Sequence, residues 1–185
     1  MGVRLRRGGE VGAHRRRRVL LLAFRPGAGH GSAPSDVVAE AIARCVVFKA
    51  DVVAQDKTES RGVRECLNYG HTLAHAIEKL SGYGTYSHGH AVAEGMRFAV
   101  LLGESLVGTP AELAEAQAQL LDALNLPALD WKATPENVLE TMKRDKKARH
   151  GQVRFMLLED VGAWKLVDVD DATILRHLQT YFAGK

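Results

Sequence analysis

From residue 35 onward, apolar residues recur every three or four positions, and this spacing constrains the fold more than any other feature of the sequence. Such a repeat places the apolar side chains on one face of an α-helix, which must then pack against other elements. Short polar or glycine- and proline-containing stretches separate the repeats. The pattern predicts helices within residues 33–56, 63–82, 88–108, 109–127, 134–149 and 170–185.

Capping signals mark the start of several of these segments. Ser35 or Asp36 suits the N-cap of the first helix, because both side chains accept hydrogen bonds from backbone N–H groups. Thr109 and Thr134 each precede a proline. In both cases we expect the threonine to be the N-cap and the proline to be the first helical residue.

One segment departs from the helical repeat. Residues 152–169, QVRFMLLEDVGAWKLVDV, contain two apolar runs on either side of EDVGA, which is typical of a β-hairpin. The sequence therefore predicts a mainly α fold: a helical bundle of about five or six helices with one small β-hairpin near the C-terminus.

The first 34 residues differ in composition from the rest. Residues 1–33 contain eight arginines, one glutamate and no lysine, with a single short apolar run, VLLLAF. Three interpretations stay open: a secretory signal, a phosphate-binding arm, and a disordered or non-native leader from a misassigned gene start. The body of the chain uses lysine as well as arginine, which favours the leader. We therefore divide the chain into an Arg/Gly-rich leader, 1–34, and a helical domain, 35–185.

Charge and hydropathy argue against nucleic-acid and membrane partners. The whole chain has a formal net charge of +3. The leader carries more than this excess, so the body is mildly acidic. No apolar run approaches the roughly 18 residues that a membrane span needs. Cys45 and Cys66 lie within apolar helical repeats, which favours reduced core thiols and a cytoplasmic location over a disulfide.

Four of the eight histidines lie within residues 67–95, LNYGHTLAHAIEKLSGYGTYSHGHAVAEG. On one helix His71 and His75 share a face, with their Cβ atoms about 5–6 Å apart. His88 falls where the next helix should begin, and that helix would bring a third imidazole back to the same place. Such a cluster can hold a Zn²⁺-like ion, can divide metal binding and proton transfer among its members, or can be an ordinary polar face.

Arg64 and Asn68 precede these histidines on the same predicted helix. The spacing puts a guanidinium, an amide and two imidazoles along one stripe. A stripe that faced the core would be apolar, so this one should face water or an anionic ligand. The guanidinium suits a phosphate or a carboxylate.

At these residues the sequence resembles 3-dehydroquinate synthase, a lyase of the shikimate pathway that leads to chorismate and the aromatic amino acids. The resemblance rests on KADVV, LNYGHTLAHAIE, GYGTYSHGHAVAEGM and DKKARHGQVRFMLLEDVG. It runs from Asp36 to the C-terminus and covers that family's C-terminal helical domain.

The resemblance implies a sugar-phosphate substrate, 3-deoxy-D-arabino-heptulosonate 7-phosphate, which the family converts to 3-dehydroquinate with release of phosphate. It also implies two cofactors. NAD⁺ transiently oxidises a substrate hydroxyl, and a divalent metal, Zn²⁺ or Co²⁺, polarises the oxygen being oxidised. The family is commonly homodimeric.

Site residues follow from the resemblance by position. It implies that His71 and His88 bind the metal, and that His75 transfers protons and contacts the substrate phosphate. Glu59 is the candidate for the family's acidic catalytic residue, and His90, where the family often has glutamate, is expected to be exposed to solvent. The matching substrate-binding positions are Lys49, Arg64, Asn68 and one lysine of DKK, either Lys146 or Lys147.

The resemblance also implies parts that residues 1–34 cannot supply. The family has an N-terminal nucleotide-binding α/β domain that holds NAD⁺, and a glutamate upstream that is the third metal ligand. We therefore expect the isolated chain to be an incomplete, inactive fragment with a docking surface for that domain. Two alternatives stay open: a non-catalytic metal-binding helical remnant, and a related sugar-phosphate cyclase such as 2-deoxy-scyllo-inosose synthase, against which Arg64 and Asn68 together argue.

Overall fold

Helices α4 and α3 form the centre of the structure. The structure is a computed structural model and describes residues 35–58, 60, 62–145 and 152–184. The elements, in chain order, are α2 (Ser35–Gln55), the 3-10 helix η1 (Val63–Asn68), α3 (His71–Ser81), α4 (His88–Leu106), α5 (Ala111–Ala123), α6 (Pro135–Asp145), β1 (Val153–Asp160), β2 (Ala163–Val169) and α7 (Asp171–Ala183). The predicted mainly α fold with one hairpin is confirmed. The division into a leader and a domain stays a prediction, because residues 1–34 lie outside the described part of the chain.

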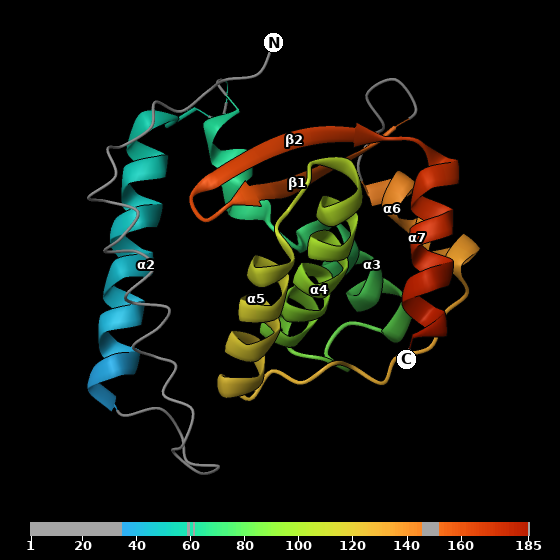
Figure 1. Cartoon of the computed structure of the whole chain (residues 1–185), viewed down its shortest axis with the longest axis horizontal. Helices are drawn as coiled ribbons and strands as arrows, with labels where there is room; N and C mark the ends of the chain where they lie inside the picture. The colour runs from blue at the N-terminus through green and yellow to red at the C-terminus, as the bar shows by residue number, and fades with distance from the viewer. Residues whose placement is uncertain (1–34, 59, 61, 146–151, 185) are drawn as a thin grey trace.

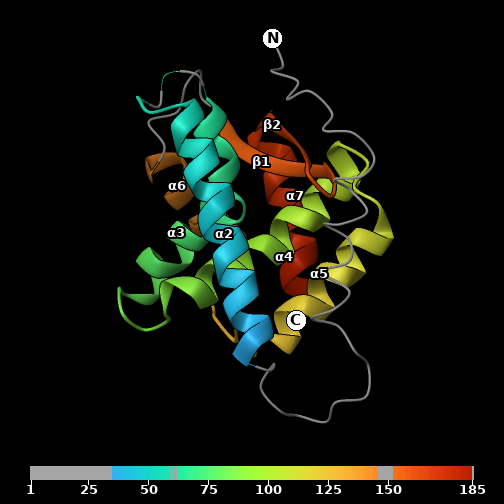
Figure 2. The same ribbon diagram turned by 90° about the vertical axis from the view of Figure 1, so that its left-hand side faces the viewer.

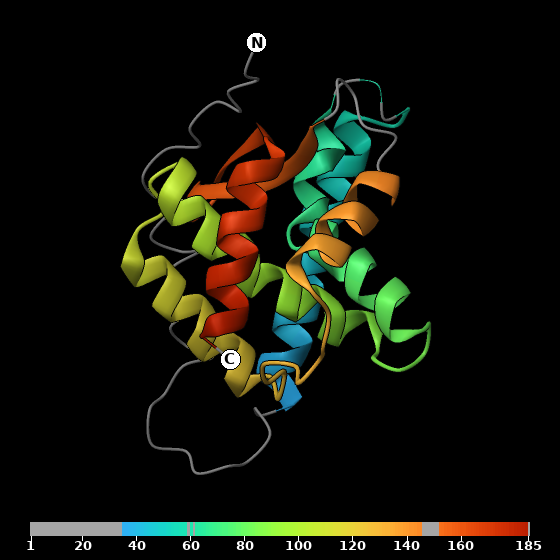
Figure 3. The same ribbon diagram turned by 90° about the vertical axis from the view of Figure 1, so that its right-hand side faces the viewer.

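The core lies where α3, α4, α6, α7 and the hairpin meet. The hairpin crosses one end of the helices, and α5 and α7 lie on either side of α4 (Figures 1 and 3). Phe98 of α4 is fully buried, and its ring lies 6.1 Å from that of Phe155 on β1 and 5.6 Å from that of Tyr181 on α7. Burial of these large apolar side chains is the main force that holds the body together.

A buried carboxylate adds polar ties to this core. Glu94 of α4 is fully buried and accepts hydrogen bonds from the Leu129 backbone N–H (3.0 Å), the Trp131 indole N–H (3.3 Å) and the Tyr181 hydroxyl (2.6 Å). Burial and the nearby carboxylate raise the pKa of Tyr181. Glu94 thereby joins the segment before α6, and also α7, to the central helix.

The predicted helix over 63–82 is wrong in one respect: it is broken. η1 ends at Asn68, and α3 starts at His71 after Gly70, whose φ of +81° lies in the left-handed region that favours glycine. A close approach also requires glycine here, because a Cβ built on Gly70 would lie 2.7 Å from the Val92 carbonyl oxygen of α4. On the facing helix, a Cβ built on Gly95 would overlap the Gly70 carbonyl oxygen. The break therefore allows α3 and α4 to pack backbone against backbone.

The two Thr-Pro starts behave differently. Thr134 accepts a hydrogen bond from the Asn137 backbone N–H at 3.3 Å, as an N-cap does, and α6 starts at the following proline. Thr109 does not act as a cap; its buried hydroxyl donates to the Leu158 carbonyl oxygen of β1, and α5 starts at Ala111 after Pro110. A tertiary hydrogen bond to the hairpin replaced the local one at Thr109.

The hairpin forms as the sequence predicts. Strands β1 and β2 pair antiparallel, with Val153 opposite Val169 and Leu158 opposite Trp164. Next to it, the hydroxyl of Thr72, in the first turn of α3, donates to the Arg154 carbonyl oxygen at 3.2 Å. The hairpin therefore anchors the start of the helix that carries the first two histidines.

Helix α2 differs from the rest, because it stands to one side of the body (Figures 1 and 2). Its C-terminal end packs on η1 through Val52, which lies in a small cluster with Val63 and Cys66. Further toward its N-terminus, large apolar side chains are exposed: Val38, Ile42, Val46, Val47 and Phe48. Among the helices described, none is long and apolar enough to cross a membrane.

The two cysteines lie in these contrasting environments. Both are free thiols, which agrees with the prediction that they form no disulfide. Cys66 is buried, and burial raises the pKa of its thiol. The prediction of a core position is wrong for Cys45, which is exposed on α2. The apolar repeat around Cys45 is real, but no described element covers it.

Candidate functional site

Three of the four histidines gather where α3 meets the start of α4. His71 is the first residue of α3, His75 follows one turn later, and His88 is the first residue of α4. The ring of His71 lies 5.8 Å from that of His75 and 5.3 Å from that of His88, measured between centroids. The return of α4 therefore brings a third imidazole to the first two, as the sequence predicts.

The fourth histidine has a local role. Ser87 is the N-cap of α4, and its hydroxyl accepts from the His90 backbone N–H at 3.3 Å. The His90 Nδ1 lies 2.7 Å from the same hydroxyl. His90 is partly buried rather than fully exposed, and its ring belongs to the cap of the helix.

The backbone orients the ring of His71. Its Nδ1 lies 3.3 Å from the Tyr69 carbonyl oxygen, which only accepts, so Nδ1 carries the proton and Nε2 keeps a free lone pair. Burial is the main cause that lowers the pKa of His71, and the nearby His88 and His75 lower it further. A neutral imidazole with a free Nε2 is the form that binds a metal ion.

A carboxylate orients the ring of His88. Its Nδ1 lies 2.8 Å from Glu78 Oε1, and an ionised carboxylate only accepts, so Nδ1 carries the proton of the neutral ring and Nε2 keeps the lone pair. Metal-binding histidines usually donate their second ring N–H to a carboxylate or a carbonyl. The donor set of His71 and His88 therefore fits Zn²⁺ or Co²⁺.

Glu78 was absent from the residues that the sequence predicted for the site. A helical signal was present, because Glu78 follows His75 by three residues and His71 by seven, which puts all three on one face. The structure offers no complete metal cage: over residues 35–145 and 152–184, as far as they are described, no group of three or more His, Cys, Asp or Glu side chains could hold a metal ion.

The predicted substrate-binding residues lie on other elements. Arg64, partly buried, and Asn68, exposed, belong to η1, so the break at Gly70 interrupts the single stripe that the sequence predicted. Buried Asp56 accepts from the backbone N–H groups of Val63 (3.0 Å) and Arg64 (3.5 Å), and so holds the start of η1.

The remaining predicted residues have less structural context. Lys49 is exposed on α2. Glu59, Lys146 and Lys147 lie outside the described residues, so their roles stay predictions. The structure thus brings His71, His75, His88 and Glu78 together, and it places Arg64 and Asn68 on the short helix that leads into them.

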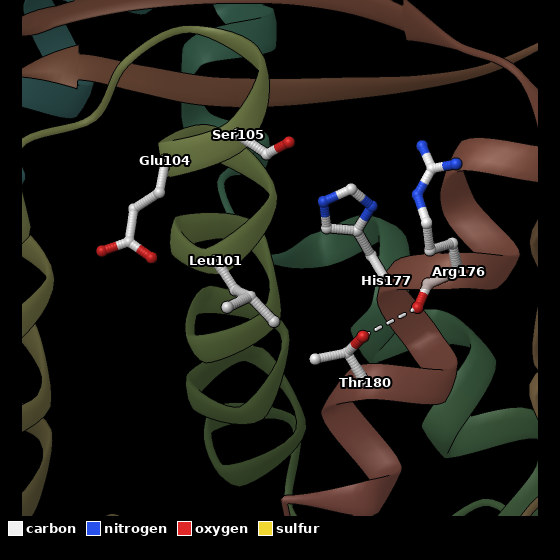
Figure 4. A pocket seen from close by; sticks show the side chains of 6 residues that line it. All are labelled: Leu101, Glu104, Ser105, Arg176, His177 and Thr180. Atoms are coloured by element: carbon white, nitrogen blue, oxygen red, sulfur yellow. Dashed lines mark hydrogen bonds between the residues drawn. The ribbon is translucent and has the colours of Figure 1, made fainter.

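A shallow groove between α4 and α7 contains none of these residues (Figure 4). Within it, the Thr180 hydroxyl donates to the Arg176 carbonyl oxygen at 3.1 Å. The charged side chains on its rim, Glu104 and Arg176, are both exposed. The groove is lined by Leu101, Glu104, Ser105, Arg176, His177 and Thr180. We assign it no catalytic role.

Two solved structures share the fold of this chain. A 2-deoxy-scyllo-inosose synthase complexed with carbaglucose-6-phosphate, NAD⁺ and Co²⁺ matches with a TM-score of 0.65 at 22% identity, over 87% of this chain and 50% of that one. A 2-epi-5-epi-valiolone synthase from Streptomyces hygroscopicus with NAD⁺ and Zn²⁺ bound matches with a TM-score of 0.62 at 19% identity, over 82% of this chain and 42% of that one. At these identities the likeness shows the fold.

Sequence relatives are more similar. The 3-dehydroquinate synthase of Neisseria meningitidis serogroup C is 44% identical over 145 residues, and that of Bacillus cytotoxicus is 37% identical over 146. These alignments cover 78% and 79% of this chain but 40% and 39% of the relatives, so the chain spans about two-fifths of their length. The family described as 3-dehydroquinate synthase C-terminal matches residues 29–148. The chain therefore belongs to the 3-dehydroquinate synthase C-terminal family.

Proposed function

We propose that this chain forms the metal-binding and part of the substrate-binding half of a 3-dehydroquinate synthase. In this reaction 3-deoxy-D-arabino-heptulosonate 7-phosphate is converted to 3-dehydroquinate with release of phosphate, in the cytoplasm. The observation that carries the proposal is the pair of imidazoles, His71 and His88, with ring centroids 5.3 Å apart and each Nδ1 held by an oxygen acceptor, a backbone carbonyl for His71 and a carboxylate for His88. The relatives' name, 3-dehydroquinate synthase, supports this choice of reaction.

His71 and His88 would hold the metal through their Nε2 atoms. A bound Zn²⁺ or Co²⁺ supplies a Lewis acid that polarises the substrate oxygen undergoing oxidation. Solved structures of the same fold carry NAD⁺ together with Co²⁺ in one case and Zn²⁺ in the other, which supports this choice of ions and cofactor.

Other residues of the chain would bind and orient the substrate. His75, one turn from His71, moves a proton and contacts the phosphate. Arg64 suits a carboxylate or phosphate through paired N–H donors, and Asn68 suits hydroxyl groups. Lys49, with Lys146 or Lys147, adds positive charge for the anionic ends of the substrate, and Glu59 is the proposed acidic catalytic residue.

We further propose that catalysis needs the portion of the relatives that has no counterpart in this chain. Two imidazoles leave a catalytic Zn²⁺ short of the usual three protein ligands. That portion would bind NAD⁺ and would supply the third protein ligand of the metal. The chain by itself should then show no measurable turnover.

The test is phosphate release from the heptulosonate phosphate in the presence of NAD⁺ and Zn²⁺ or Co²⁺. The chain alone should release none above background. Robust release that disappears in His71→Ala would show that the chain is a complete enzyme. Release that persists in His71→Ala would point to a contaminating phosphatase, so this variant is the necessary control.

A second candidate function is that of a related cyclase, because the fold matches 2-deoxy-scyllo-inosose synthase over 87% of the chain. The 44% identity to a 3-dehydroquinate synthase favours the first. An assay that supplies the remaining portion from the Neisseria relative and offers heptulosonate 7-phosphate or glucose 6-phosphate separates the two. A third candidate, a non-catalytic metal-binding protein, predicts turnover on neither.

The apolar face of α2 is the proposed docking surface for that remaining portion. The side chains of Ile42 and Val46 are 57% and 61% exposed, whereas apolar side chains that face a core are buried. Lys49 follows Ile42 by seven residues and so shares its face. A face that carries both apolar side chains and a substrate-binding lysine fits the rest of the same enzyme better than it fits a second copy of this chain.

Co-expression tests this docking. The chain is produced together with the part of the N. meningitidis enzyme that lies outside the 145 matched residues. We expect co-purification that is lost in Ile42→Glu and kept in Leu124→Glu. Leu124, the C-cap residue that follows α5, is a matched control because its apolar side chain is 51% exposed. Co-purification that survives Ile42→Glu would exclude this surface. A dimer of the chain alone that Ile42→Glu dissociates would show that a second copy is the occupant instead.

A further inference from the structure

We infer that Glu78 is a positioning residue for the metal centre: its carboxylate holds the His88 ring as the Nδ1–H tautomer and aims Nε2 at the space shared with His71. The inference rests on the metal site of the proposed function. The contact that carries it is the 2.8 Å hydrogen bond between His88 Nδ1 and Glu78 Oε1.

Burial differs sharply between the two partners. The Glu78 side chain is only 16% exposed, whereas that of His88 is 58% exposed. A surface imidazole with no partner samples several rotamers and both neutral tautomers, and ordering it for metal binding costs conformational entropy. Glu78 is the fixed member of the pair, so it restrains a ring that is otherwise free to turn.

The placement of Glu78 also fits this role. It lies on α3, one turn beyond His75 and two turns beyond His71, and its partner is the first residue of α4. One hydrogen bond therefore links the helix that carries His71 to the helix that carries His88. It fixes the second imidazole relative to the first.

Glu78 fits a supporting position better than that of a third ligand. Its Oε1 is already engaged by His88, and the described residues include no group of three side chains arranged to hold a metal. A carboxylate behind a histidine ligand fixes the tautomer and raises the basicity of the other ring nitrogen. Loss of such a partner typically weakens metal binding by about 10–100-fold.

The first readout needs no metal. Long-range ¹H–¹⁵N NMR spectra of the full chain report the tautomer of each imidazole at a pH where the rings are neutral. We expect His88 to be the Nδ1–H tautomer in the wild type and a mixture in Glu78→Ala. Glu78→Gln retains an acceptor oxygen and should restore most of the preference. An unchanged His88 tautomer in Glu78→Ala would overturn the inference.

The second readout is calorimetric titration with Zn²⁺. Glu78→Ala should weaken binding by about tenfold or more. Glu104→Ala removes an exposed carboxylate near the C-terminal end of α4, whereas His88 is the first residue of that helix, and should leave binding unchanged. Binding that is insensitive to Glu78→Ala would overturn the positioning role and leave the metal site intact. No Zn²⁺ binding by the wild type, with the tautomer effect still present, would overturn the metal site while Glu78 would still be shown to orient the ring.

Discussion

Helices α4 and α2 carry the same kind of apolar repeat, yet the structure treats them differently. In α4 most of the repeat is buried against α3, α5, α7 and the hairpin, and Phe98 is inaccessible to solvent. In α2 the C-terminal end packs on η1, whereas farther along the helix no other described element covers Phe48, which is 50% exposed. A helical apolar pattern therefore shows that a helix has a face to bury, but the partner that buries it must be found elsewhere.

The largest expected effect is a difference in stability between two variants, each of which truncates one phenylalanine, Phe98 in α4 or Phe48 in α2. Phe98→Ala should lower the free energy of unfolding by about 3–5 kcal/mol, because it removes a fully buried ring and leaves a cavity. Phe48→Ala should change it by less than about 0.5 kcal/mol, since half of that ring is already in water. Urea unfolding followed by circular dichroism measures both. Similar losses for the two variants would mean that α2 is covered in solution.

A smaller effect should come from the contact between α3 and α4. Gly95→Ala puts a methyl group into the Gly70 carbonyl oxygen and should cost about 1–3 kcal/mol as the helices separate. It should also weaken Zn²⁺ binding, because His71 and His88 lie on the two helices that move apart. In Gly89→Ala, the matched control on α4, the nearest atom, Ser87 Oγ, would lie 4.0 Å from the new Cβ. Equal Zn²⁺ affinity in wild type and Gly95→Ala would show that the close packing of α3 and α4 does not position the two metal-binding histidines.

A pH-dependent effect should appear at the histidine site but not on α2. The pKa of His71 is lowered in the folded chain, so the unfolded chain binds more protons once the pH falls toward the ordinary histidine value of about 6.5. The free energy of unfolding should therefore fall as the pH drops from 7.5 to about 5.5, and it should fall less steeply in His71→Gln. Denaturant titrations across this range, without metal, measure the slope. Identical slopes for the two proteins would contradict the shift.

The smallest expected effect on stability comes from a cysteine substitution, and the labelling of the two cysteines again compares α2 with the packed part of the structure. A thiol reagent should modify exposed Cys45 rapidly in the folded chain and buried Cys66 only after unfolding, because the reactive thiolate must be both formed and reached. Cys45→Ser should remove the fast phase with little effect on stability. Co-expression with the remaining portion of the Neisseria enzyme should slow the labelling of Cys45. Fast labelling of both thiols would show that η1 does not protect Cys66.

Local chemistry along the chain predicted most of the secondary structure. The hairpin at 152–169 needed only its two apolar runs and the turn between them. The Thr-Pro signal predicted the cap correctly at Thr134. The candidate histidines could also be read from spacing, because His71 and His75 are one turn apart on any helix that contains both. The family resemblance then distinguished their proposed roles, which spacing by itself had left open.

Several features depended on contacts between distant residues. The predicted helix breaks at Gly70, where φ is +81° and where α4 approaches too closely to leave room for a side chain. Thr109 gives its hydroxyl to β1 instead of capping α5. Cys45 is exposed because the apolar face of α2 has no described partner, although its pattern matches that of a buried helix.

The sequence by itself determined the helical class, the hairpin and the three imidazoles, since these depend on residue type and spacing within one segment. Only the tertiary structure decided how the His88 ring is oriented toward His71, and that Glu78 rather than another residue holds its Nδ1. The physical reason is that ring orientation depends on a hydrogen bond between two helices. The spacing of residues along one helix carries no information about that bond.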